Sequence, residues 1–334
     1  MVVSGLRRVL PGIGLLLGIG LLARLVAAPI PNVSPLILAI VIGMGVANTI
    51  GVPEWAEAGV QTHGLWLASG IVIMGASLTL ESVLEAGLLL VTLVVATILV
   101  TLVLIELLAR VFFGVSDELS SLTAAGASIC GVSAIVAVAG TIKANAKNIA
   151  YAVGTILVFD VVTLFSYPVI GALLDLADQI YGIWVGLVMF STGPVTAAGF
   201  AYSDVAGQWA TLTKLTRNAL LGLAVLIYSV YYARQQVSDV QPQSYGHVLW
   251  ANFPKFVLGF LAMMVIASLG VLSDAQLEHM ENAYQWLFLL AFAGLGTGID
   301  IRDMYQAGMK PLVVVLTSLI IMSIVALLVL TALF

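Results

Sequence analysis

The segment from Leu119 to Lys147 carries the residues best suited to bind a solute. Hydroxyl, thiol and glycine residues crowd an otherwise apolar stretch: Ser120, Ser121, Thr123, Gly126, Ser128, Cys130, Gly131 and Ser133. Two interpretations are open. The small polar residues pack tightly against neighbouring helices, or the helix is interrupted near residues 128–133 and its free amides face a cavity. The second interpretation makes four of them substrate-binding residues, because a half-helix N-terminus attracts an anion: Ser128, Cys130, Gly131 and Ser133.

A second segment of the same kind runs from Phe190 to Gly199. Pro194 removes a backbone amide and clashes with the preceding turn, and Gly193 beside it favours a break over a smooth bend. The residues at this break are further substrate-binding candidates: Ser191, Thr192 and Gly193. Two interrupted spans in one chain indicate the binding site of a carrier.

Two carboxylates are candidates for binding a coupling ion. Asp160 lies deep in the apolar run 153–165, where it would bind a cation, carry a proton, pair with a base or make a structural hydrogen bond. Asp300 ends another apolar span, where ligand contact and helix termination are both open. Glu106 and Arg110, four residues apart, predict an ion pair on a helix surface.

Lys214 and Arg217 lie three residues apart, on one face of a helix that enters the membrane. We expect their side chains to extend to the lipid headgroups, as long basic side chains commonly do. The alternative is a vestibule that attracts anions.

Other chemistries find little support in the sequence. The three histidines show no metal-ligand spacing, and the only cysteine, Cys130, excludes an internal disulfide and a cysteine-rich metal site. Walker, G-x-S-x-G and H-E-x-x-H motifs are absent. Cys130 has no histidine placed in a span to activate it. We therefore expect no enzyme, no metal and no cofactor.

The elements that position these residues follow from composition. Apolar residues make up 61% of the 334 residues and charged residues 9%, with a net charge of −5 and no basic block, which excludes nucleic-acid binding. Hydropathy predicts spans near 11–28, 34–50, 64–80, 87–112, 119–141, 150–173, 183–200, 212–233, 255–273, 285–300 and 311–333. The prediction is an all-α polytopic membrane protein with about ten or eleven transmembrane helices.

We expect one membrane domain over residues 1–334, with approximate halves 1–175 and 176–334. An ungapped internal similarity joins Gly75–Gly87 to Gly296–Gly308, each with an initial glycine and a final Ala-Gly. This similarity predicts inverted repeats, which solute carriers often contain around a central site.

The chain resembles the YeiH-type family of sulfate exporter-like membrane proteins. The resemblance is carried by Gly126-Ala-Ser-Ile-Cys-Gly-Val-Ser-Ala-Ile135, Thr213-Lys-Leu-Thr-Arg217, Phe256-Val-Leu-Gly-Phe-Leu261 and Gly294-Leu-Gly-Thr-Gly-Ile-Asp300. It implies inverted repeats and two interrupted helices that cross at mid-membrane. Two positions depart from the family pattern: Phe190-Ser191 replaces a His followed by an acidic residue, and Asp160 replaces a glycine.

The function expected from these features is secondary transport that exports or exchanges a small anion, with sulfate implied only by the resemblance. A cation/proton antiporter is the first alternative, and a membrane scaffold or sensor is the alternative of another class. The expected partners are the bilayer of the cell membrane, which the chain crosses several times, a small anion, and H⁺ or Na⁺ as the coupling ion. A homodimer is left open.

Overall fold

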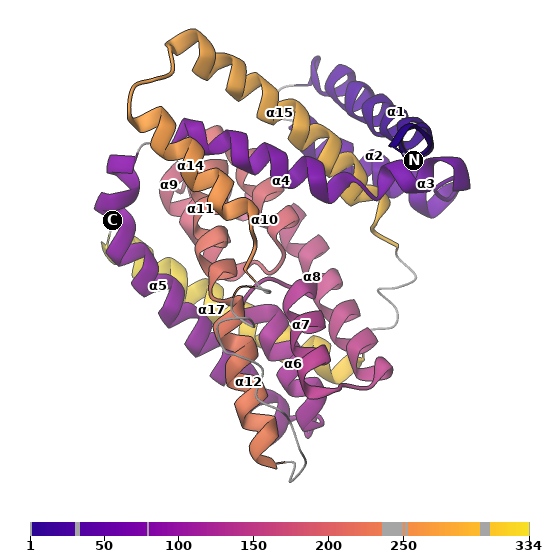
Figure 1. Cartoon of the computed structure of the whole chain (residues 1–334). Helices are drawn as coiled ribbons and strands as arrows, with labels where there is room; N and C mark the ends of the chain where they lie inside the picture. The colour runs from indigo at the N-terminus through magenta and orange to yellow at the C-terminus, as the bar shows by residue number, and fades with distance from the viewer. Residues whose placement is uncertain are drawn as a thin grey trace. The chain divides into compact units, whose positions relative to one another are not determined.

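The computed structural model describes residues 2–30, 34–78, 80–235, 250, 253–300 and 308–333. All regular elements in these ranges are helices, and no strand occurs among them (Figure 1). The predicted all-α class is confirmed. Each of the eleven apolar segments predicted above coincides with one helix or with consecutive helices.

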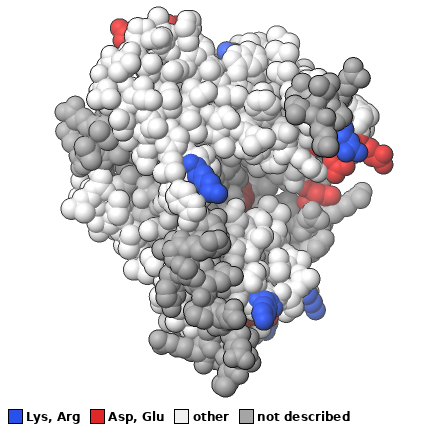
Figure 2. Space-filling model, in the orientation of Figure 1, with Lys and Arg blue, Asp and Glu red and all other residues white. Residues whose placement is uncertain are grey.

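Long apolar helices identify the chain as a polytopic membrane protein. Five are long and apolar enough to cross a membrane: Arg8–Ala27, Gly87–Phe112, Ala146–Leu173, Asp204–Tyr232 and Met309–Leu333. Shorter apolar helices are Pro35–Thr49, Val132–Ile142 and Phe256–Ser268. On the face drawn in Figure 2, few described side chains are charged. A helix bonds its backbone groups internally, which suits it to lipid.

The described residues form two compact units, each built from two separate stretches of the chain. The first unit comprises residues 1–87 and 255–301, and the second comprises residues 88–254 and 302–334. Both predicted halves of the sequence therefore contribute to each unit.

The first unit is a bundle in which the helix α15 packs against α1, α2 and α4. Its helices are α1 (Val2–Ala27), α2 (Pro35–Thr49), α3 (Glu54–Val60), α4 (His63–Met74), the 3₁₀ turn η1 (Gly75–Ser77), α14 (Phe256–Ser268) and α15 (Asp274–Thr297). A side chain at Gly43 or Gly296 would collide with backbone atoms of the facing helix, so α2 and α15 are in backbone contact. The Asn48 side chain donates a 2.7 Å hydrogen bond to the Ile299 carbonyl, which lies 251 residues later.

The second unit contains the candidate binding residues and nearly all of the long apolar helices. It comprises α5 (Leu80–Leu107) from Leu88 onward, the π-helix η2 (Leu108–Phe112), α6 (Asp117–Ser128), α7 (Val132–Ile142), α8 (Ala146–Leu173), α9 (Asp178–Val188), α10 (Thr192–Tyr202), α11 (Asp204–Ala219), α12 (Leu221–Gln235) and α17 (Met309–Leu333). The helix α11 packs against α9 and α10, and α8 packs against α6 and α10. This arrangement surrounds the breaks after α6 and α9 with helices.

The predicted inverted repeat is only partly covered, because Thr79 and residues 301–307 lie outside the described residues. The helices α2 and α14, each one predicted span before a repeat, end alike. A glycine with positive φ follows each of them, Gly51 after α2 (φ 79°) and Gly270 after α14 (φ 67°). Glycine adopts this left-handed conformation without the steric cost that other residues carry, and it commonly ends helices. The superposition of Gly75–Gly87 on Gly296–Gly308 stays a prediction.

Candidate functional site

Both predicted helix interruptions are present in the second unit. The helix α6 ends at Ser128 and α7 begins at Val132, while α9 ends at Val188 and α10 begins at Thr192. Gly131 has φ 69° and ψ −133°, a conformation that only glycine adopts readily. Pro194 is the third residue of α10, where its missing amide costs no helical hydrogen bond.

The two interruptions are in contact at Gly131 and Ser191. A Cβ atom added to Gly131 would lie 2.1 Å from the Ser191 hydroxyl oxygen, far closer than two such atoms can approach. The starts of α7 and α10 therefore lie side by side.

The N-terminal ends of α7 and α10 are rich in unused donors. The N-cap of α7, Gly131, has no side chain that could cap the helix, and the N-cap of α10, Ser191, makes no side-chain capping bond. Within the described residues, the amides of Val132, Ser133 and Thr192 have no hydrogen-bond acceptor. Such amides carry the partial positive charge of the helix end.

The predicted binding residues differ in how accessible they are. Ser133 is exposed, and Ser191 and Thr192 are half-buried. Cys130, Gly131 and Gly193 are buried at the interruptions. Ser128 is fully buried, and its hydroxyl donates to the carbonyl of Ala125 in its own helix. The first turn of α7, at Ser133, is thus the accessible part of the site.

Lys214 and Arg217 do not extend to lipid headgroups, and that prediction is wrong. Both side chains lie on α11 and are buried, with exposures of 0% and 1%. The Lys214 ammonium donates to the carbonyls of Ile129, at 2.6 Å, and Met189, at 3.4 Å. Neither do they form a vestibule, because both side chains are buried and the Lys214 ammonium and the terminal nitrogens of Arg217 donate to the protein's own carbonyls.

Arg217 joins the two interrupted helices directly. One terminal nitrogen donates to the carbonyls of Gly186 and Met189, both at 2.8 Å. The other donates to Ala127, at 3.1 Å, and to Ser128, at 2.9 Å. These carbonyls belong to the C-terminal ends of α9 and α6, which carry partial negative charge and lack helical donors. The guanidinium supplies donors to both ends, which accounts for its burial.

Asp160 lies on α8 and is 3% exposed. One carboxylate oxygen accepts a 2.9 Å hydrogen bond from the amide of Ser191, the N-cap of α10. The sequence left four roles open for Asp160, and the contact in the structure matches one of them, a hydrogen bond to a neighbouring helix. The negative charge also complements the positive end of α10.

Asn218 is a site residue that sequence reasoning missed. Its side-chain amide donates a 2.9 Å hydrogen bond to the hydroxyl of Thr192, the first residue of α10. The side chain is 5% exposed, and its carbonyl oxygen has no partner within the described residues. The signal in the sequence is the run Thr211-Leu-Thr-Lys-Leu-Thr-Arg-Asn218, which is polar on most sides of a helix inside a membrane bundle.

Asp300 belongs to the first unit, whereas Asp160 belongs to the second. Asp300 is exposed and follows the end of α15. The two predicted ion-coupling residues therefore lie in different units.

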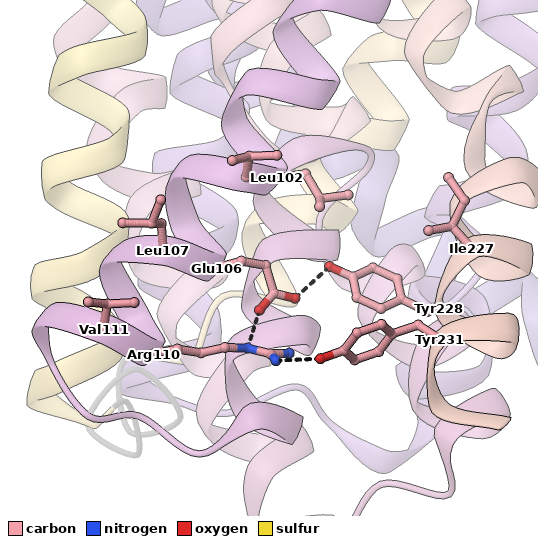
Figure 3. Close-up of a pocket in the computed structure, with 9 residues that line it drawn as sticks. Leu102, Glu106, Leu107, Arg110, Val111, Ile227, Tyr228 and Tyr231 are labelled. Carbon is pink, nitrogen blue, oxygen red and sulfur yellow. Dashed lines mark hydrogen bonds and ion pairs between the residues drawn. The ribbon is translucent and has the colours of Figure 1, made fainter. Parts of the chain in front are cut away.

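Glu106 and Arg110 form the predicted ion pair, but it is part of a larger network than a surface pair (Figure 3). Their charged groups lie 2.5 Å apart, and Glu106 also accepts from the hydroxyls of Ser121, at 2.8 Å, and Tyr228, at 3.0 Å. Arg110 donates to the Tyr231 hydroxyl at 2.9 Å. A groove of about 400 Å³ beside the network is lined by Leu102, Val103, Glu106, Leu107, Arg110, Val111, Ile227, Tyr228 and Tyr231. The network ties α5 and η2 to α6 and α12.

The family model described as conserved hypothetical protein 698 matches residues 11–315 of the chain. The chain belongs to this family. Similar members carry the name UPF0324 membrane protein. One from Nitratidesulfovibrio vulgaris is 31% identical over 313 residues, which is 90% of this chain and 87% of that protein.

Two further UPF0324 membrane proteins show the same degree of similarity. The one from Bartonella henselae is 32% identical over 293 residues, covering 87% of this chain and 82% of its own length. The one from Oceanobacillus iheyensis is 32% identical over 303 residues, covering 89% and 87%. No solved structure matches the chain. The UPF0324 relatives and the long apolar helices together establish a multi-pass membrane protein.

Proposed function

We propose that this protein is a secondary active transporter of the cell membrane that exports or exchanges a small anion. The observation that carries the proposal is the contact of Gly131 with Ser191, which places the start of α7, with its free amides and the exposed Ser133, against the start of α10. The free amides at the N-terminus of a half-helix can bind an anion through the backbone alone.

The chemistry of the interruptions favours an anion over a cation. The carbonyls that would bind a cation, at the ends of α6 and α9, are already taken by Lys214 and Arg217. The amides at the starts of α7 and α10 are the groups left for a ligand. The substrate-binding residues of the proposal are Ser133, Ser191 and Thr192, and Gly131 allows Ser191 to approach the start of α7 closely.

A cation/proton antiporter is the second candidate, and the buried carboxylate of Asp160 is the observation that favours it. In an antiporter Asp160 would exchange H⁺ for Na⁺, and Asp160→Asn would abolish the pH or sodium dependence of transport. In the anion transporter, transport of the anion persists in this variant. A scaffold or sensor would show neither activity.

The experiment that tests the proposal is a thermal-shift panel on the purified chain, followed by flux in proteoliposomes. A ligand that binds only the folded state raises the melting temperature, by an amount that grows with its concentration above Kd. We expect small oxyanions to stabilise the protein and K⁺ alone to leave the melting temperature unchanged. Stabilisation by cations and by no anion would favour the antiporter.

A further inference from the structure

We infer that Asn218 determines the substrate class, and that the start of α10 takes an anion that carries a hydrogen-bond donor, a hydroxyl or an N–H group, near its oxyanion. The inference rests on the proposed function, since it concerns the same site. It follows from the hydrogen-bonding groups that the fold gathers at the first turn of α10.

The side-chain amide of Asn218, on α11, is buried with its oxygen unpaired. The side chain is 5% exposed, and its nitrogen Nδ2 donates a 2.9 Å hydrogen bond to the hydroxyl of Thr192, the first residue of α10. The oxygen Oδ1 is buried and has no donor within the described residues. Because both atoms are bonded to the same carbon, the unpaired oxygen also lies beside the start of α10. Buried polar atoms are rarely left without partners. The amide thus presents an acceptor at the helix start.

Three donors at the same helix start have no acceptor within the described residues. The Ser191 amide is already bonded to a carboxylate, and Pro194 has no amide. The backbone N–H groups left over are those of Thr192 and Gly193, in the first turn of α10. The Thr192 hydroxyl accepts from Asn218, so its own proton remains to be donated. Donors of this kind at a helix N-terminus bind the oxygens of an anion.

These groups together specify the chemistry of the ligand. An oxyanion would accept from the two amides and the Thr192 hydroxyl, and a hydroxyl or N–H group on the same ligand would donate to Oδ1 of Asn218. An anion without such a donor would leave the buried oxygen unpaired. A site that hydrogen-bonds a substrate hydroxyl rejects the analogue that lacks it. Asn218 is therefore a specificity-determining residue for anions that carry a donor.

A buried water molecule is the competing partner for Oδ1 of Asn218, because buried waters commonly bond polar atoms that the protein leaves unpaired. Such a water would pair the oxygen whether or not the ligand has a donor. The two explanations therefore differ in whether the affinity of an anion depends on its hydroxyl group.

The test measures dissociation constants by calorimetry on the purified full-length chain. It uses two pairs of probes that differ in one hydroxyl group, glycolate with acetate and 2-hydroxyethanesulfonate with ethanesulfonate. All of them carry a single negative charge at neutral pH, so charge does not distinguish the members of a pair. We expect the hydroxylated member of at least one pair to bind more tightly than its partner by about tenfold or more, because only this member pairs Oδ1.

Asn218→Leu keeps a side chain of similar size and removes the acceptor. The hydroxylated probe should lose its advantage, so that the two members of the pair bind within about twofold of each other, while the affinity of the plain anion is kept. A general loss of packing would instead weaken both members alike and keep their ratio. The matched control is Thr216→Val on the same helix, where the lost hydroxyl bonds the Leu212 carbonyl of α11. This control should keep the ratio of the unmodified protein.

Equal binding of the two members of each pair by the unmodified protein would overturn the inference, and this measurement stands even if Asn218→Leu does not fold. An unchanged ratio in a folded Asn218→Leu protein would overturn it as well. So would binding of other oxyanions in the thermal-shift panel without binding of either hydroxylated probe. Absence of binding by every anion in the panel and in both pairs would instead reject the proposed function.

Discussion

The carbonyl oxygen of Met189 accepts hydrogen bonds from both Arg217, at 2.8 Å, and Lys214, at 3.4 Å. A single backbone group at the end of α9 therefore binds two buried cations from α11. Both cations also bind the end of α6, so α11 fixes the position of each interruption relative to the other.

Arg217→Met should destabilise the protein strongly. The methionine keeps much of the buried volume but removes all four hydrogen bonds of the guanidinium, and it leaves Lys214 as the remaining basic partner of the ends of α6 and α9. We expect a loss of about 3 kcal/mol, since hydrogen bonds to charged groups contribute about 1.5–3 kcal/mol each and are not additive. Chemical denaturation in detergent measures it. The control is Lys310→Met, which removes an exposed cation and should change stability by less than about 0.5 kcal/mol. Equal effects of the two would contradict a structural role for Arg217.

Gly131→Ala should destabilise the protein, because the added Cβ would collide with the Ser191 hydroxyl and φ is 69°. A non-glycine residue in left-handed backbone costs about 1–3 kcal/mol before any collision. The control is Gly140→Ala on α7, where a Cβ meets nothing within 4 Å. That change should be neutral or stabilising, by up to about 1 kcal/mol. Adding Ser191→Ala to Gly131→Ala should restore part of the melting temperature. No restoration would mean that backbone strain alone causes the loss.

Ser133→Ala should weaken anion binding by about 1 kcal/mol, the usual value of one neutral hydrogen bond, which is roughly a fivefold rise in Kd. Ser128→Ala, at the last residue of α6, is the matched control. The Ser128 hydroxyl is fully buried and bonds its own helix. This variant should leave Kd unchanged. A pure packing role for this segment predicts that neither variant alters Kd, and that outcome would count against the amides of α7 as the binding site.

Tyr228→Phe tests the network around Glu106. Tyr228 is 4% exposed and donates to the Glu106 carboxylate, so losing its hydroxyl should cost about 1–2 kcal/mol. A double-mutant cycle with Glu106→Gln should give a coupling energy above about 0.5 kcal/mol, as expected for groups in contact. Coupling near zero would reduce the network to the ordinary surface ion pair that the i, i+4 spacing suggested.

Sequence alone predicted the helix breaks because their causes are local. Gly131 and Pro194 each disturb the backbone within one turn, and the surrounding polarity marks the segment as buried in protein rather than in lipid. The same local reasoning failed for Lys214, whose acceptor at Ile129 lies 85 residues away. Spacing along one helix shows that two cations share a face, but it does not show which helix that face meets. Asn218 was missed for the same reason, since its partner Thr192 comes from another helix.

The hydrogen bond between Asn48 and Ile299 also has a consequence for biosynthesis. Its partners are 251 residues apart, and translation proceeds at about 5–20 residues per second. The ribosome therefore needs roughly 13–50 s after making Asn48 before Ile299 exists. During that interval the face of α2 that carries Gly43 reaches the membrane without α15. Residues 88–254 of the second unit are synthesised before α15. Insertion factors that shield such a face would act on the nascent chain in this window.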